Sequence, residues 1–594
     1  MNRKTATGQG QKPRALFYLI ALLLPVVFFA VLEGGIRLTG LAAEEPLFIA
    51  GPPGYLRPNE AVVNRFFIHP SRAPRVSIDT TFFRETKPDD LFRVVVQGGS
   101  SAAGFPYGKW ASLTGMLGAR LKRAAPGREI EVVSTAMSAV NSYALVDFAD
   151  EIIELQPDAV VIYAGHNEYL GVLGVGSAYG AGRSPAVTRA LLTLRESHLF
   201  RAMQYLYGAL TGPSAPESER RSGTLMARIA RERAIVYGSE SYQAGLEQFR
   251  DNLALLLRRY AAAGVPVFIG TLASNESGQA PFINGPGDTT SLDAIRRLGG
   301  DPGSNDADGF FALGRSLQNS GDNAGAREAY RWARDLDALR FRAPSAMNGI
   351  LELSAGDGLA TIVRAEEMLA GEARDGIIGN DLMLEHLHPN LRGYFLLAEA
   401  YYEALTERIE PERWSDGPDR AAAWRDIPVT EIDELAAGYR LRYLKSDWPF
   451  RDEKQPVTLP EPQNAVEHIA QDWFLGRLSW QEAMQRALVH YQQVGRTDLA
   501  ARVAMNLAEA FPFEASPHYV SGRLLLATGR PRLGASYLEE ALGMAPGDPD
   551  IGIALADAYR ELGRETEARR ALEEVLRRHP GNEEALSRLE DVSR

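Results

Sequence analysis

The chain has 594 residues, of which 45% are hydrophobic and 24% are charged, as in ordinary globular proteins, and its length allows two or three domains. A net charge of -12, with no basic stripe in the main body, argues against binding of nucleic acid. Because the sequence has no cysteine, disulfides, thiolate metal sites and lipid-modified cysteine anchors are excluded.

An uncharged apolar stretch, residues 15–32, lies near the amino terminus and is just long enough to span a bilayer. The tail before it, residues 1–14, carries four basic residues and no acid, which predicts a cytoplasmic tail. We therefore expect a single-pass signal anchor over residues 15–36, with the bulk of the chain extracytoplasmic, in the periplasm if the cell is Gram-negative. A cleaved signal peptide and a buried core helix are the alternatives.

Residues 37–88 contain scattered proline, glycine and arginine, and we expect a stalk and a lead-in to the first strand. The following run, LFRVVVQGGSSAAG, has three consecutive valines that predict a strand buried on both faces. Gly98 and Gly99 then permit a sharp turn, so Ser100 is expected at the carboxyl edge of this strand. Open α/β sheets bind ligands at that edge. Taken alone, such a turn is more typical of a structural turn or a phosphate-binding loop.

Apolar strands and amphipathic helices alternate after this turn. Strands are predicted at 130–133, 160–163 and 265–270, and helices at 145–155 and 246–260. This alternation predicts a parallel sheet covered by helices. Asn167 follows the second of these strands, where its amide is a candidate donor to a developing oxyanion, and its alternative role is a helix cap.

Two segments interrupt the alternation. Residues 171–240 begin with a glycine-rich run and continue as an arginine-rich, helix-like stretch, which we expect to form a lid or substrate wall. Residues 305–340 have the cadence of a helical repeat hairpin, although a generic amphipathic hairpin packed on the sheet explains them equally well.

The run Glu385-His386-Leu387-His388-Pro389 offers an acid and a base three residues apart. A serine hydroxyl needs an imidazole to take its proton and a carboxylate to orient that imidazole, and His388 and Glu385 are the candidates. Pro389 disfavours helix at His388, which predicts a loop that leads into a helix over 391–405. Metal ligation by Glu385, His386 and His388 is the alternative. The other histidine beside Asn167, His166, is expected to be structural or to lie at the rim.

At these residues the chain resembles the SGNH, or GDSL-type, hydrolase superfamily, over roughly residues 88–405. The resemblance implies Ser100 as the nucleophile, His388 as the general base and Glu385 as its orienting carboxylate. It also implies an oxyanion hole formed by Asn167 with the backbone N-H groups of Ser100 and Ala139.

The chain departs from the family pattern at four places. Gly99 stands where the family has the aspartate before the serine, and Glu168 and Glu385 stand for two further aspartates. Ala139 stands for the glycine whose backbone N-H enters the oxyanion hole, so its role depends on an allowed backbone conformation.

The carboxyl-terminal part has a period of 34 residues, set by Gly495, Gly529 and Gly563. Pro512, Pro546 and Pro580 repeat with the same spacing. This pattern resembles tetratricopeptide repeats (TPR), in which stacked helical hairpins bury one continuous core.

The expected organisation is therefore α/β followed by all-α. An SGNH-hydrolase-like α/β/α domain over 89–405, with helical insertions, follows the transmembrane helix, and a partly helical linker over 406–479 leads to a TPR-like solenoid over 480–594.

These features predict a membrane-anchored, extracytoplasmic serine ester hydrolase that works through an acyl-enzyme and needs no metal or organic cofactor. The resemblance and the location point to an acylated envelope glycan as the ester substrate, and the repeats point to a protein partner. The alternatives are a catalytically inactive envelope scaffold and an O-acyltransferase that uses the same residues.

Overall fold

The computed structural model describes residues 13–67, 82–125, 127–177, 185–211, 234–414 and 417–592, together with Val76 and Ile78. The chain forms two compact units. Unit 1 comprises residues 1–46, 61–75 and 184–222, and unit 2 comprises residues 47–60, 76–183 and 223–594.

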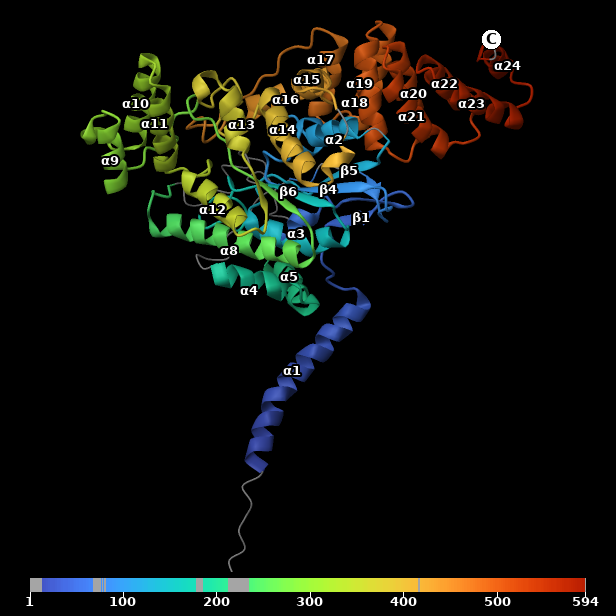
Figure 1. Ribbon diagram of the computed structural model, residues 1–594. Helices are drawn as coiled ribbons and strands as arrows, with labels where there is room; N and C mark the ends of the chain where they lie inside the picture. Colours follow the sequence, from blue (N-terminus) through green and yellow to red (C-terminus); the bar gives the residue numbers. More distant parts are fainter. Residues whose placement is uncertain are drawn as a thin grey trace, which may run out of the picture. The chain divides into compact units, whose positions relative to one another are not determined.

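Unit 1 contains the amino-terminal helix α1 (Pro13–Thr39), the short 3-10 helix η1 (Val62–Phe66), and the helices α4 (Pro185–Arg195) and α5 (His198–Thr211). Among the described residues, α1 alone is long and apolar enough to cross a membrane, over Phe17–Thr39, and an 18-residue window of this helix has a mean hydropathy of 2.4 (Figure 1). A signal sequence has the same properties, so α1 is compatible with both interpretations of the amino terminus. The rest of the segment expected over 171–240 falls partly outside the described residues.

Unit 2 is built on a five-stranded parallel sheet with the order β5-β4-β6-β7-β8. Its strands are β4 (Phe92–Gly98), β5 (Ile130–Ser134), β6 (Ala159–Tyr163), β7 (Val267–Gly270) and β8 (Thr361–Val363). Every residue of β4 and β6 is buried, as expected for strands covered on both faces.

Helices cover both faces of this sheet (Figure 1). One face carries α2 (Leu113–Ala124), α13 (Ala365–Glu372) and α14 (Leu391–Arg408). The other carries α3 (Ser142–Glu154), α8 (Glu240–Ala262) and α12 (Ser345–Gly356). Short 3-10 turns occur at η3 (Lys109–Ala111), η4 (Pro302–Ser304), η5 (Arg374–Gly376) and η6 (Pro411–Arg413). This arrangement confirms the predicted α/β/α class.

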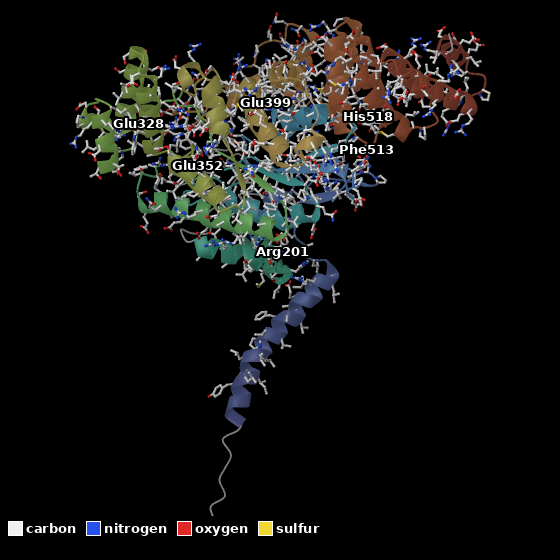
Figure 2. The ribbon with its side chains drawn as sticks, in the orientation of Figure 1. Arg201, Glu328, Glu352, Glu399, Phe513 and His518 are labelled. Carbon is white, nitrogen blue, oxygen red and sulfur yellow. The ribbon has the colours of Figure 1, made fainter. Side chains whose placement is uncertain are left out.

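The segment expected to be a stalk contains a small antiparallel sheet, formed by β1 (Phe48–Ala50), β2 (Tyr55–Pro58) and β3 (Phe83–Arg84). Its aromatic side chains pack against the carboxyl-terminal repeats. The ring of Phe513, labelled in Figure 2, lies 5.4 Å from that of Tyr55 and 5.0 Å from that of Phe82.

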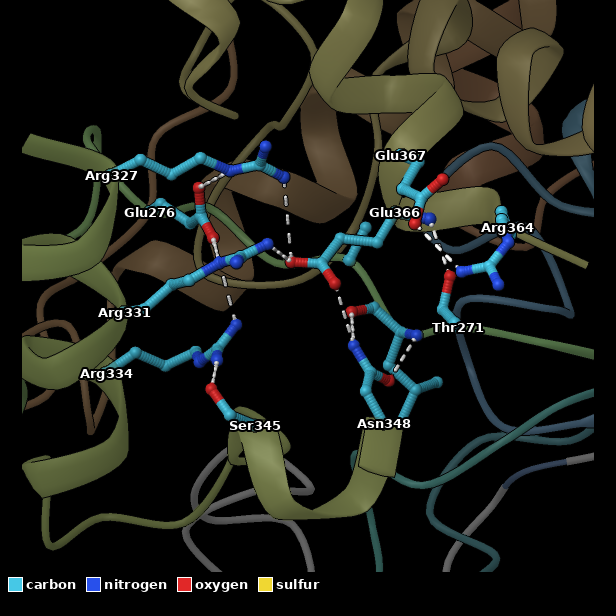
Figure 3. A network of polar contacts seen from close by, with 12 residues as sticks. Thr271, Glu276, Arg327, Arg331, Arg334, Ser345, Asn348, Arg364, Glu366 and Glu367 are labelled. Carbon is cyan, nitrogen blue, oxygen red and sulfur yellow. Dashed lines mark hydrogen bonds and ion pairs between the residues drawn. The ribbon is translucent and has the colours of Figure 1, made fainter. Parts of the chain in front are cut away.

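Residues 305–340 form a helical hairpin, α10 (Ala307–Ser320) and α11 (Asn323–Leu336), which follows α9 (Thr289–Arg297). Arg327, Arg331 and Arg334 lie on one face of α11 and meet two carboxylates of the α/β core (Figure 3). Arg331 contacts Glu366 Oε1 at 2.6 Å and the buried Glu276 Oε1 at 3.3 Å. Because breaking a buried ion pair leaves an uncompensated charge, this network holds the hairpin in place.

The carboxyl-terminal helices are α18 (Trp480–Gln493), α19 (Thr497–Ala510), α20 (Ala515–Ala527), α21 (Pro531–Met544), α22 (Pro549–Glu561), α23 (Glu565–Arg578) and α24 (Glu583–Val592). The periodic glycines Gly495, Gly529 and Gly563 follow the first helix of each hairpin, with φ between 70° and 73°. This left-handed conformation closes a helix end and favours glycine, which explains the period of 34 residues.

Residues 406–479, expected to be a partly helical linker, form α15 (Arg420–Arg425), α16 (Glu431–Lys445) and α17 (Ala465–Phe474). Side chains of α16 and α17 share one buried apolar cluster with those of α18 and α19. Lys122 of α2 also forms an ion pair with Glu509 of α19. The repeats therefore continue into helices that pack on the α/β domain.

Gly98, the last residue of β4, tests how tightly the sheet edge is packed. A Cβ at this position would lie 2.4 Å from the backbone oxygen of Tyr163 and 2.5 Å from Ala102 Cβ. We expect Gly98→Ala to lower the free energy of unfolding by about 1–3 kcal/mol, measured by urea denaturation. Gly349→Ala is the control, because nothing lies within 4 Å of its new Cβ, and it should be neutral or slightly stabilising. Equal effects of the two substitutions would contradict this packing.

Candidate active site

The strand order places a topological switch point at one edge of the parallel sheet. From β4 the chain crosses to β5 on one side and then to β6 on the other, so the loops after β4 and β6 leave in opposite directions. Ligands of open α/β sheets bind at such a switch point. The last residues of these strands, Gly98 and Tyr163, are neighbours in the sheet. Ser100 follows Gly98 by two residues and Asn167 follows Tyr163 by four, so both lie at this edge of the sheet.

Ser100, His388 and Glu385 form a continuous hydrogen-bonded chain. Ser100 Oγ lies 2.8 Å from His388 Nε2, although the two residues are 288 positions apart in sequence. His388 Nδ1 is hydrogen-bonded to Glu385 Oε1, and this carboxylate oxygen also accepts the backbone N-H of His388 at 3.1 Å. Since a carboxylate accepts the Nδ1 proton, Nε2 is left to accept the serine proton.

A tight loop folds the His388 imidazole back over Glu385. The N-H of Leu384 donates to the carbonyl of His388 at 2.9 Å, and the N-H of Asn390 donates to Leu382 at 2.9 Å. The side chain of Asn390 then accepts the N-H of Gly393 at 3.0 Å and caps α14. The helix therefore begins only after the histidine.

Glu385 is almost fully buried, yet it is held as a carboxylate. Burial raises the pKa of Glu385, but the adjacent His386 and His388 lower it more, so this pKa lies well below its ordinary value. Asn275 fixes the same loop, because its Nδ2 donates to the carbonyl of Glu385 at 3.0 Å. The Glu385 carboxylate is thus ionised at neutral pH, and Asn275 holds its loop in place.

His386 contacts the second carboxylate oxygen of Glu385 through Nδ1, a partner that the sequence analysis did not assign. Its ring lies among those of Phe282, Phe341 and Phe450, at centroid distances of 5.4 to 5.8 Å. Burial lowers the pKa of His386, and Glu385 opposes this shift. The alternating histidines gave the one sequence signal for this contact.

Asn167 lies beside the serine turn. Its Nδ2 donates to the carbonyl of Val140 at 3.0 Å, and a Cβ on Gly99 would approach this nitrogen to 2.8 Å. Glycine in place of the family's aspartate therefore leaves room for the amide. The Asn167 amide nitrogen carries a second N-H besides the one that it donates to Val140.

Ala139 has φ 67°, in the left-handed region. Glycine adopts this conformation without strain, which explains why a glycine is usual at this place, and alanine holds it at a cost of about 1–3 kcal/mol. The carbonyl of Ala139 accepts the N-H of Val172 at 2.8 Å and thereby fixes the loop.

Two buried groups support the loop after β6. Glu168 accepts the N-H of Ser142 at 3.1 Å and its hydroxyl at 2.7 Å, and Gln248 also donates to this carboxylate. His166 Nδ1 accepts the N-H of Ala343 at 3.1 Å, and burial lowers the pKa of His166 to about 3. A neutral, hydrogen-bonded His166 has a structural position rather than that of a base.

Within the described ranges, no group of three or more His, Asp or Glu side chains is arranged to hold a metal ion. His386 and His388 contact the two oxygens of Glu385 instead of converging on a common point.

Two family models described as tetratricopeptide repeat match residues 486–549 and 525–590. The carboxyl-terminal helices are tetratricopeptide repeats. This match confirms the repeat family predicted from the 34-residue period. No curated protein matches the chain.

Several solved structures are similar to parts of the chain. The second TPR domain of human RPAP3, solved with an HSP70 peptide, is 17% identical with a TM-score of 0.18, and the match covers 19% of this chain and 92% of that one. A GDSL-like lipase from Bacteroides thetaiotaomicron is 12% identical with a TM-score of 0.25, over 53% of this chain and 89% of that one. A catalytic mutant of an acetylxylan esterase from Geobacillus stearothermophilus is 12% identical with a TM-score of 0.25, over 52% and 93%. Similarities this low support no inference about activity.

Glu168 makes the stability of this site depend on pH. Burial raises the pKa of Glu168 from 4.5 to about 7, so the folded state holds a proton that the unfolded state releases between these values. Its contribution to stability is full below pH 4.5, falls as pH rises towards 7 and is level above it. We expect wild type to lose about 3 kcal/mol relative to Glu168→Gln between pH 4.5 and 7.5, measured by urea unfolding. Parallel pH profiles of the two proteins would contradict the raised pKa.

Proposed function

We propose that the chain is a serine ester hydrolase of the SGNH/GDSL type that works through an acyl-enzyme. The observation that carries this proposal is the hydrogen-bonded chain from the Ser100 hydroxyl through His388 to the buried carboxylate of Glu385. Hydroxyl, imidazole and carboxylate in this order make a weak nucleophile reactive.

In the proposed first half-reaction, Ser100 Oγ attacks the ester carbonyl carbon while His388 Nε2 takes the hydroxyl proton. Collapse of the tetrahedral intermediate breaks the ester C-O bond, and His388 gives its proton to the leaving alcohol. The acyl group then remains on Ser100. The ionised Glu385 stabilises the imidazolium formed in each step and keeps Nδ1 protonated.

In the second half-reaction, His388 takes a proton from water as the water oxygen attacks the acyl carbon. The new tetrahedral intermediate expels Ser100 Oγ, which regains its proton from His388, and the carboxylic acid leaves. Both intermediates carry a negative oxygen. The proposed donors to this oxygen are the Asn167 amide and the backbone N-H groups of Ser100 and Ala139.

We further propose that α1 anchors the hydrolase with its bulk in an extracytoplasmic space, in the periplasm of a Gram-negative cell. The apolar helix and the basic tail before it support this topology. The ester substrate proposed for this location is an acylated envelope glycan. The tetratricopeptide repeats would bind a protein partner, because stacked hairpins of this kind present an extended binding surface.

Ser100→Ala should abolish ester hydrolysis. Without the nucleophile no acyl-enzyme forms, so kcat/KM for a short-chain aryl ester should fall by at least about a thousandfold. Ser101→Ala is the matched control, since this neighbouring hydroxyl donates only a long hydrogen bond of 3.4 Å to the carbonyl of Leu387. It should keep the wild-type rate within a few-fold.

A folded wild-type protein with no turnover on aryl esters or acetylated glycans would favour an inactive scaffold. Turnover that needs a sugar hydroxyl as acceptor would favour an acyltransferase.

Asn167→Ala tests the proposed oxyanion donor. Removing one donor of this kind costs about 3 kcal/mol of transition-state stabilisation, so kcat should fall by two orders of magnitude while KM changes little. Asn464→Ala removes an asparagine that caps α17 and should leave kcat unchanged. An unaltered kcat in Asn167→Ala would remove this residue from the proposed mechanism.

A further inference from the structure

Large apolar side chains are exposed on α4 and α5, two helices of unit 1. They are 46% to 78% exposed and comprise Val187 and Leu194 of α4 with Met203, Tyr205, Leu206, Tyr207 and Leu210 of α5. Elsewhere in the described part of the chain, α1 excepted, exposed side chains of this kind are scattered over several elements. Contiguous exposed apolar surface on a folded protein marks a contact with a partner or a membrane.

The spacing of these residues, Tyr205 excepted, places them on one stripe of each helix. Met203, Leu206 and Leu210 are related by i, i+3 and i+7, and Val187 and Leu194 by i and i+7. Helical periodicity directs such positions to a single face. Both helices are therefore amphipathic, with an apolar face directed outwards.

The start of α5 is hydrogen-bonded to the carboxyl-terminal end of α1. Glu33 of α1 accepts hydrogen bonds from Ser197 Oγ at 2.8 Å, His198 N at 3.0 Å and Leu199 N at 2.7 Å. These contacts satisfy N-H groups at the amino terminus of α5, which have no partner within the helix. Arg201, labelled in Figure 2, donates from Nε to the carbonyl of Ala42 at 2.6 Å. If α1 spans the bilayer, α5 begins at the membrane surface.

The charge of the two helices suits this surface. Together they contain the partly exposed Arg189 and Arg195 and no acidic residue, and their third arginine, Arg201, is buried and paired with Glu44. Basic side chains are attracted to anionic headgroups, and tyrosines such as Tyr207 favour the boundary between headgroups and acyl chains. A partner protein requires no such continuity with the anchor, and so the bilayer is the occupant that these contacts favour.

We propose that α4 and α5 form a membrane-surface hairpin, whose apolar stripes lie in the headgroup and upper acyl region of the leaflet at the outer end of α1. This inference rests on the proposed anchor. Amphipathic helices of this type insert their apolar face to a depth of about 5–10 Å. The chain would then be held to the membrane by an embedded surface as well as by one helix.

The absence of native cysteine allows a direct test on the full-length chain. Leu206→Cys and Leu210→Cys are each labelled with an environment-sensitive fluorophore, and the protein is reconstituted in phosphatidylethanolamine and phosphatidylglycerol vesicles with or without lipids brominated in the upper acyl chain. Both labels should shift to shorter emission wavelength and lose most of their emission in the brominated vesicles. Leu353→Cys, at a leucine of α12 that is 74% exposed against 78% for Leu210, gives the background for an exposed leucine.

A third label, at Val27→Cys in α1, distinguishes the membrane-surface hairpin from the α1 anchor. Quenching at Val27 with only background quenching at Leu206 and Leu210 would overturn the hairpin and leave the anchor. Loss of quenching at all three positions would overturn the anchor and the hairpin together. Labels at Leu206 that quench one another between chains, without brominated lipid, would show that a second copy covers this face and would also overturn the proposal.

Discussion

The candidate site depends on one hydrogen bond, between Ser100 and His388, which are 288 positions apart in the sequence of the α/β domain. Ser100 leaves the first strand of the parallel sheet, and His388 lies in the last loop before α14. Neither group is reactive alone, because a serine hydroxyl keeps its proton at neutral pH and an unoriented imidazole is not held in the tautomer whose Nε2 accepts a proton. The sheet order that brings the ends of β4 and β6 together, and the packing of α14 on that sheet, are what this contact requires.

Backbone constraints around Ser100 and His388 follow from the need to hold this contact. Gly98 and Gly99 have no room for a Cβ, since Tyr163 and Asn167 lie against them. Ala139 is held in a left-handed conformation, and Glu385 is buried as a carboxylate between two histidines. Each of these features costs stability, and they are concentrated where a pre-organised site would need them.

The sequence predicted the parts of this structure whose signal is local and strong. Consecutive valines identified the buried strand β4, the 34-residue glycine period identified the repeats, and residue types at family spacing identified the serine, acid and histidine, whose roles stay predictions. Other features carry no such signal. The strand β8, Thr361–Val363, is too short and only partly buried for its pattern to be visible, and β1 to β3 pair only through contacts distant in sequence. The contact of His386 with Glu385 depends on the shape of a loop, which the alternating histidines alone do not determine.

In the proposed mechanism, His388 makes Ser100 nucleophilic. Mass spectrometry of the chain after reaction with an organophosphonate tests it most directly, because the adduct identifies the nucleophile and the rate of its formation reports its activation. We expect one adduct, on the peptide that contains Ser100, formed much more slowly in His388→Ala. An unmodified Ser100 in the folded protein, or a labelling rate that His388→Ala leaves unchanged, would contradict it.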